Sequence, residues 1–153
     1  MTDRDSHRQL QARVIDALYV EAMVLADEAR SYFDSFGKLD RDHLTPLQRV
    51  SFSCESLKVT TRLMHIIAWL LSKRAIAAGE FEQRGTLSPT LRLGEAALSD
   101  EKTLAALPAD ARALIEASAE LYSRIKRLDA NLGMDIRPAN RVQSLQKQIE
   151  RAF

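Results

Sequence analysis

The side chains with the most chemical potential are one cysteine, Cys54, and three histidines, His7, His43 and His65. Cysteine nucleophiles need an imidazole base within hydrogen-bonding reach. Cys54 and His65 are eleven residues apart on one expected helix, a separation of roughly 16 Å that prevents their contact within a chain. We therefore expect Cys54 to be a small buried hydrophobic residue. His65 is expected to be a hydrogen-bonded edge or interface residue, with pH sensing as the alternative.

The known patterns for metal and phosphate binding are missing from the sequence. Zinc sites need clustered cysteine and histidine residues, and di-iron bundles need Glu-x-x-His pairs that face inward. The nearest match, Asp40-x-x-His43, falls in an expected turn. No glycine-rich phosphate loop is present either. We expect no catalytic residue, no cofactor and no metal, and hence a protein that is not an enzyme.

The net charge and the cysteine count indicate which kinds of partner and cell compartment suit this chain. The 22 Lys and Arg residues against 21 Asp and Glu residues give a net charge of +1, which does not favour a nucleic acid or a membrane surface as partner. A single cysteine excludes an intramolecular disulfide framework and fits a reducing cytoplasm. The charged start of the chain shows no signal peptide. We therefore expect a soluble cytoplasmic protein whose partners are proteins.

Hydrophobic periodicity predicts an all-α fold, with three long antiparallel helices in a bundle. Apolar residues recur at steps of three and four over residues 7–36, 46–78 and 108–132. These helices form an expected domain of residues 1–133. The connection between the second and third helices, residues 79–107, is unusually long for a bundle.

The expected ends of the helices follow from capping residues. Thr45 can cap the second helix, Pro46 suits its first position, and Gln48 completes a capping box. Gly37 is expected to be the left-handed residue after the first helix, and Gly79 the end of the second. Within the long connection, Ser99-Asp100-Glu101 can start a short helix.

The tail, residues 134–153, is more polar than the rest of the chain. It still carries a weak amphipathic pattern after Pro138, so it is expected to be flexible or weakly helical. The apolar positions that we expect to dock on a partner are Val142, Leu145, Ile149 and Phe153.

The second helix is apolar on two opposite sides. One side comprises Leu57, Thr61, Met64, Ile67, Ala68, Leu71 and Ala75. The other side comprises Phe52, Val59, Leu63, Ile66 and Leu70, with Trp69 beside them. A helix that is apolar almost all round is normally covered all round, so neither side is expected to face water.

A three-helix bundle covers only one broad side of this helix, so the other needs a further cover. The long connection, the tail or a second copy of the chain can supply it, and we expect a homodimer because two-fold dimers are the commonest oligomer. Trp69 is either ordinary packing or an anchor of the contact, and Arg62 either meets an acidic partner or is solvated. The expected dimer or partner interface comprises Phe52, Val59, Arg62, Leu63, Ile66, Trp69 and Leu70.

Residues 55–76 of the second helix, read with Gly79 and Glu80, resemble the RcdA family, the "regulator of CtrA degradation" proteins of bacteria. The most specific part is V-T-T-R-L-M at residues 59–64, followed by A-W-L-L at residues 68–71. Three shorter segments are also similar to family members, namely residues 17–22, 121–129 and 148–153.

The resemblance implies a dimeric three-helix bundle without enzymatic activity and with a functional C-terminal tail. It implies an adaptor in regulated proteolysis that presents protein substrates to the ClpXP protease in bacterial cell-cycle control. The implied partners are a second copy, the protease machinery, protein substrates and other adaptors. The alternative that the residues leave open is a dimeric helical scaffold or interaction protein without a protease link.

Overall fold

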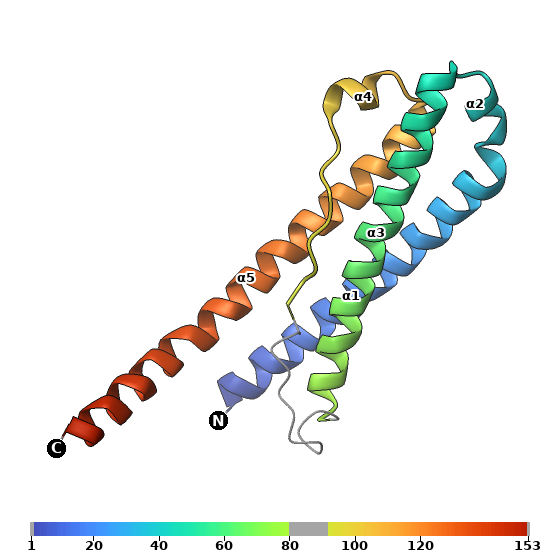
Figure 1. Ribbon diagram of the computed structural model, residues 1–153. Coiled ribbons are helices and arrows are strands. Elements are labelled where there is room, and N and C mark those ends of the chain that lie inside the picture. The colour runs from blue at the N-terminus through green and yellow to red at the C-terminus, as the bar shows by residue number, and fades with distance from the viewer. Residues whose placement is uncertain (1, 80–91, 153) are drawn as a thin grey trace.

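The computed structural model describes residues 2–79 and 92–152, and within them every regular element is helical (Figure 1). The elements in chain order are α1 Thr2–Ser31, the π-helix η1 Tyr32–Phe36, α2 Lys38–Asp42, α3 Pro46–Ala77, α4 Glu101–Ala105 and α5 Ala109–Ala152. Each of the long helices α1, α3 and α5 contacts the other two. The prediction of an all-α fold is therefore confirmed.

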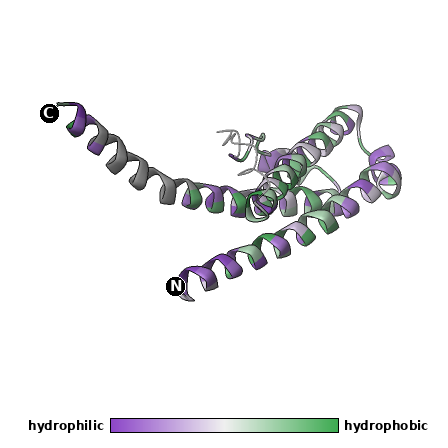
Figure 2. Cartoon of the chain, turned by 90° about the horizontal axis from the view of Figure 1, so that it is seen from below, coloured by the Kyte–Doolittle hydropathy of each residue, from purple (hydrophilic) through white to green (hydrophobic). Residues whose placement is uncertain are grey.

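The core lies where these three helices meet. Buried apolar residues recur along α1 at the expected steps, from Ile15 through Ala22 to Ala29. On α5 the core residues described run from Ala111 to Leu132. The first turns of α1, residues 2–10, are exposed throughout, and Figure 2 shows this end of the helix as mainly hydrophilic. The core therefore involves only part of the length of α1.

The first helix ends in a π-helical turn and not in a left-handed glycine, which corrects the prediction for Gly37. The Gly37 N–H donates to the Tyr32 carbonyl at 2.6 Å, and its φ of −81° is right-handed. A Cβ at Gly37 would lie 2.7 Å from the Tyr32 carbonyl oxygen. Gly37 is thus needed for close backbone approach. The Tyr32 hydroxyl donates to Asp40 at 2.8 Å, which ties η1 to α2.

The predicted limits of the second helix agree with α3. The Gln48 N–H donates to Thr45 Oγ1 at 3.3 Å, and the Thr45 N–H donates to Gln48 Oε1 at 3.0 Å, so the capping box is present. Pro46 stands in the first turn. Gly79 follows the helix with a φ of +75°, the left-handed conformation that favours glycine.

The predicted end of the third helix before Gly133 is wrong, because α5 continues to Ala152. A glycine within a helix costs only about 1 kcal/mol relative to alanine, which is too little to end a long helix. Of the four tail residues expected to dock on a partner, only Ile149 has a described side chain, and it is 58% exposed. Val142, Leu145 and Phe153 lie outside the described side chains.

The described part of the long connection packs against the bundle. Residues 92–99, which we call the strap, run alongside α3 and α5 (Figure 1). The strap then enters α4, whose N-cap is Asp100, so the predicted short helix is confirmed. Leu104 and Leu107, which follow the strap, are buried in the core.

Candidate interaction surfaces and the polar network that holds the strap

The residues that we expected at an interface with a partner lie inside the single chain. All of them are between 0% and 5% exposed, and they are Phe52, Val59, Arg62, Leu63, Ile66, Trp69 and Leu70. Side chains this deeply buried have no surface to offer a second subunit without leaving the core. Their assignment to an interface is therefore corrected, whereas the formation of a dimer remains a separate proposal.

This side of α3 is covered by α1, α5 and the strap together. The Phe52 ring packs edge-on against Phe33 with the ring centroids 5.3 Å apart, near the end of α1. The Trp69 indole N–H donates to Asp129 of α5 at 3.0 Å. Trp69 is therefore ordinary packing, and the long connection supplies part of the cover, which was the alternative to a second subunit.

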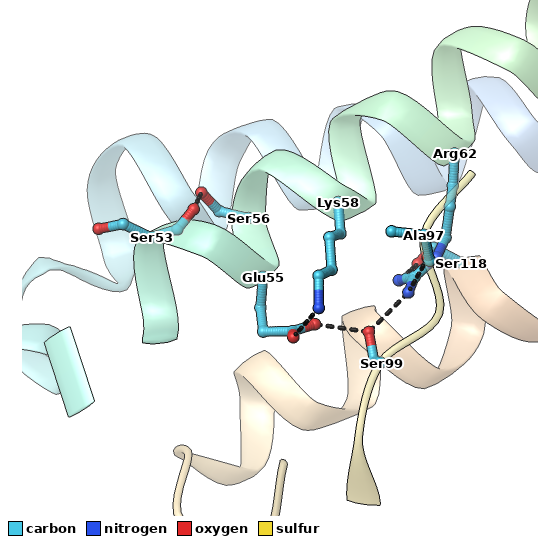
Figure 3. A network of polar contacts seen from close by, with 8 residues as sticks. All are labelled: Ser53, Glu55, Ser56, Lys58, Arg62, Ala97, Ser99 and Ser118. Atoms are coloured by element: carbon cyan, nitrogen blue, oxygen red, sulfur yellow. Dashed lines mark hydrogen bonds and ion pairs between the residues drawn. The ribbon is translucent and has the colours of Figure 1, made fainter. Parts of the chain in front are cut away.

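Arg62 of α3 is the largest fully buried side chain described, and it binds both the strap and α5 (Figure 3). Its guanidinium donates to the Ala97 carbonyl at 2.9 Å and to Ser99 Oγ at 2.6 Å, both in the strap. It also donates to Ser118 Oγ of α5 at 3.2 Å. The two alternatives drawn from the sequence, an acidic partner or a solvated side chain, are therefore both wrong for Arg62.

Glu55 balances the charge of Arg62 through an intervening hydroxyl. Ser99 Oγ accepts from Arg62 and donates to Glu55 Oε2 at 2.5 Å, while Lys58 Nζ donates to Glu55 Oε1 at 3.0 Å (Figure 3). Burial lowers the pKa of Arg62, and the charge of Glu55 opposes that shift. Arginine keeps its proton in proteins, so the buried guanidinium of Arg62 is positively charged.

Asp129 of α5 holds the other end of the strap. Its carboxylate accepts from Arg92 Nε at 3.0 Å, from the Leu93 N–H at 3.2 Å and from Trp69. Burial alone raises the pKa of Asp129, but the three hydrogen bonds and the charge of Arg92 lower it below its usual value. Asp129 therefore remains ionised near neutral pH.

The middle of the strap is fixed by close packing. The Tyr122 hydroxyl donates to the Gly94 carbonyl at 2.7 Å, and a Cβ at Gly94 would overlap the His65 ring. His65 is half-buried at this contact. Arg62, Tyr122 and Asp129 thus hold the strap mainly through its backbone and through Ser99. The roles of Asp129 and Ser118 were not predicted, although a buried position for Asp129 can be inferred from its place on the apolar stripe of α5.

The outward side of α3 is the one that we had assigned to the core. Leu57 and Met64 are 66% and 64% exposed, and Leu71 is 46% exposed. Cys54 is exposed as well, which corrects its prediction as a buried residue. The two sides were exchanged because both are apolar, and periodicity alone does not tell which one meets α1 and α5.

A second apolar surface lies on α1. Val20, Met23 and Val24 are all exposed. Nearby, Arg74 of α3 pairs with Asp16 at 3.3 Å and lies over the Tyr19 ring, which fixes α1 against α3 at the surface. On the same helix, Glu21 pairs with Arg124 of α5.

Within the described residues, no group of three or more His, Cys, Asp and Glu side chains is placed to hold a metal ion. None of the described helices is both long and apolar enough to cross a membrane. The polar network is occupied by contacts within the chain. The exposed apolar rows on α1 and α3 are therefore candidate surfaces for another molecule.

The chain is similar to a protein family and to a solved structure. The family model described as "Protein of unknown function (DUF1465)" matches residues 6–153. The chain belongs to this family. It is also similar to the crystal structure of RcdA from Caulobacter crescentus CB15, with 29% sequence identity and a TM-score of 0.60. That match covers 76% of this chain and 88% of the RcdA chain. No curated protein matches the sequence.

These findings confirm the predicted resemblance to the RcdA family. In this DUF1465 member, the two most specific segments of the resemblance both lie on α3. The first segment contains Arg62, which binds the strap directly. The second contains Trp69, which binds Asp129, the residue that holds the start of the strap. The sequence pattern that indicated the family is therefore also the part of α3 that builds the polar network.

Proposed function

We propose that this protein is a non-enzymatic adaptor in regulated proteolysis, which tethers protein substrates to the ClpXP protease in bacterial cell-cycle control. The observation that carries the proposal is the similarity to RcdA, at 29% identity over 88% of the RcdA chain. The active form that we propose is a cytoplasmic homodimer. Other adaptors are its further proposed partners.

The geometry supports a tethering role. Core packing and the ion pair between Arg74 and Asp16 join α1 to α3, so the exposed apolar rows on these two helices are held in fixed relation. A rigid body with two such rows can hold a substrate and a second protein at the same time. Tethering raises the local substrate concentration near the protease, often 10²-fold or more in effective terms, without any new chemistry.

The tail is proposed to be a docking element. Its expected apolar positions, Val142, Leu145, Ile149 and Phe153, recur at helical spacing, and amphipathic helices commonly dock in grooves of partner proteins. Ile149 is exposed and has no core role in the chain. The tail therefore has at least one apolar side chain available for a partner.

The test begins with proteome-wide protein half-lives in the parent strain and in a strain lacking this protein. We expect a small set of proteins to become longer-lived, and the same set to be longer-lived when ClpX is depleted. One of these proteins is then degraded by purified ClpXP with ATP. The purified chain should accelerate its loss at least several-fold, and Val24→Asp, on the exposed row of α1, should reduce the acceleration.

An exposed substitution on the strap, Leu98→Asp, is the matched control because Leu98 is exposed and outside both rows. If no half-life changes, or if purified ClpXP degrades the candidates equally well without the chain, the adaptor role is wrong. Partners that copurify without any protease dependence would then favour the alternative, a helical scaffold.

A further inference from the structure

The solvent-facing side of α1 carries apolar residues in a line at helical spacing. Ala17, Val20 and Val24 follow one another at steps of three and four, and all three are exposed. Leu10, one heptad before Ala17, continues the line and is 61% exposed. These four residues lie on the side of α1 opposite its buried residues, and we call them the central row.

Carboxylates run along both edges of the central row. Asp16 pairs with α3 and Glu21 pairs with α5, so these two residues mark the two edges. Asp27 follows Asp16 by eleven residues and Glu28 follows Glu21 by seven, which places one more carboxylate on each edge. All four are exposed. Residues 14–29 contain no Lys or Arg, and we call the four carboxylates the rim.

The arginines near the rim do not neutralise it. Arg124 of α5 is shared between Glu21 and Glu120. Arg30 pairs with Asp27 at 3.4 Å, but both side chains are about three-quarters exposed, so water screens this pair. The rim and Glu120 together present five carboxylates to three arginines, when the arginine of α3 is included. The surface around the central row therefore stays negative.

We infer that the central row binds a basic amphipathic helix of another protein. The row needs an apolar stripe opposite it, and the rim needs cations on both sides of that stripe. A helix with apolar residues at heptad spacing and Lys or Arg at the flanking positions supplies both. This inference deepens the proposed function by naming the chemistry of a partner, and it rests on that function only for the fate of the partner.

The spacing of the residues on α1 defines the pattern expected in the partner. Helix residues at i, i+3, i+4 and i+7 surround a hole that accepts one side chain of a facing helix. One such hole is mainly apolar, and it comprises Ala17, Val20, Glu21 and Val24. The hole one heptad later contains two carboxylates, and it comprises Val24, Asp27, Glu28 and Ser31. An apolar side chain fits the first hole. The second favours Lys or Arg, whose methylene stem can cover apolar surface while its charge meets the carboxylates.

The negative rim disfavours other kinds of occupant. A two-fold contact places a surface against itself, so a second copy would bring rim carboxylates against rim carboxylates. Nucleic acids and anionic lipid surfaces would be repelled in the same way. A basic helix is attracted instead, which speeds its encounter with α1 and fixes its register.

The contact is small, so binding should be weak and reversible. Residues 10–31 span about 33 Å, and a helix contact is about 10 Å wide, which gives roughly 700 Å² for both sides together. Stable interfaces usually bury about 1,200 Å² or more. Attraction between the rim and the partner's cations should therefore supply much of the affinity, and salt should weaken the complex.

Fluorescence anisotropy with two synthetic peptides tests the chemistry of the partner. Both are labelled helices of about three heptads with Leu at the core positions, and they carry either Lys or Glu at the flanking positions. The full-length chain should bind the Lys peptide with a Kd on the order of 10–100 µM. It should bind the Glu peptide at least about tenfold more weakly. The Kd for the Lys peptide should rise several-fold when NaCl is raised from about 20 to about 300 mM.

Charge reversal on the rim tests the location. Asp27→Lys with Glu28→Lys should weaken the Lys peptide by about tenfold and should strengthen the Glu peptide, because the charge at that end of the rim is inverted. A gain of binding cannot result from misfolding. Asp3→Lys with Asp5→Lys makes the same change of charge in the exposed first turns of α1. This matched control should leave both Kd values within about twofold.

Removal of apolar contact tests the central row itself. Val20→Ser with Val24→Ser keeps the charge and should weaken the Lys peptide several-fold, since both side chains are exposed and have no core role. Equal binding of the two peptides by the wild-type chain would overturn the inference. Equal effects of the rim reversal and its control would overturn it as well.

Two other occupants of the central row would be detected in the same experiments. A free peptide of residues 134–153 that binds more tightly than the Lys peptide would assign the row to the chain's own tail. Loss of self-association by the Val20→Ser and Val24→Ser chain in light scattering would assign it to a second copy. Either result would overturn the inference.

The peptide assay contains no protease, so it separates this inference from the proposed function. A chain that binds the Lys peptide as expected but does not stimulate ClpXP would refute the proposed function alone. A chain that stimulates ClpXP but does not bind the Lys peptide would overturn the inference alone.

Discussion

At the scale of single residues, the most consequential groups are the buried ions that hold the strap. Arg62 and Glu55 are each no more than 2% exposed, and both form a hydrogen bond with the hydroxyl of Ser99. Burying an ion is costly, so each charge depends on its partners to remain in place. The network favours the observed arrangement of the strap, because a displaced strap would take the Ala97 carbonyl and Ser99 Oγ away from the buried guanidinium of Arg62.

Replacing Arg62 should therefore destabilise the fold strongly. Arg62→Ala removes the donors to the Ala97 carbonyl and to Ser118 Oγ, and it leaves Lys58 as the cation that contacts Glu55. Breaking one partner of a buried ionic pair typically costs about 3–5 kcal/mol in the free energy of unfolding, measured by urea denaturation. The exposed pair of Arg74 and Asp16 gives the control, because Arg74→Ala should cost about 1 kcal/mol or less. Similar losses for both variants would contradict the structural role of Arg62.

Asp129 should make stability depend on acid pH. Its folded pKa is lowered, so the folded state binds this proton less readily than the unfolded state does, where the pKa is about 3.9. The stabilisation is present above that value and is lost as the pH falls through the folded pKa. Asp129→Asn should be less stable than the wild type at pH 7, and the difference should shrink on acidification below pH 4 in urea denaturation. Asp27→Asn, at an exposed pair with Arg30, should show no such convergence.

At the scale of the helices and the strap, the features predicted correctly from the sequence are those that depend on neighbouring residues, such as the ends of α3. The capping box at Thr45 and the left-handed Gly79 set the limits of α3, and both depend only on neighbouring residues. The roles of the two sides of α3 were not predictable in this way, since both are apolar and the choice depends on contacts with α1, α5 and the strap. Gly133 failed as a stop signal because a single glycine is only mildly unfavourable in a helix.

The fit of the strap against α3 is testable at Gly94. Gly94→Ala adds a Cβ that overlaps the His65 ring, so either the strap or the ring must move. Overpacking of this kind typically costs about 1–3 kcal/mol, and hydrogen exchange at strap amides should become faster. His65→Ala in the same chain should restore slow exchange, because it removes the ring that the new Cβ meets. Fast exchange that persists in the double variant would place the cause elsewhere.

At the scale of the whole molecule, the core and the tail separate along α5. The core residues described on α5 lie between Ala111 and Leu132, whereas residues 146 and 148–152 are exposed. Stability and partner docking should therefore depend on different parts of one continuous helix. The exposed apolar row of α3, with Leu57, Met64 and Leu71, likewise lies outside the core.

Truncation after Leu132 should separate folding from delivery. Because Asp129 and the core residues of α5 are retained, the melting temperature by circular dichroism should fall by no more than a few degrees. The proposed homodimer should persist in light scattering, whereas substrate degradation by ClpXP should lose its stimulation. A chain truncated after Leu128 is the matched control: it loses Asp129, and with it the hydrogen bonds to Trp69 and the strap, so it should be much less stable. Full stimulation by the chain that ends at Leu132 would show that the tail is not the docking element, and the exposed row on α1 would then be the candidate docking surface.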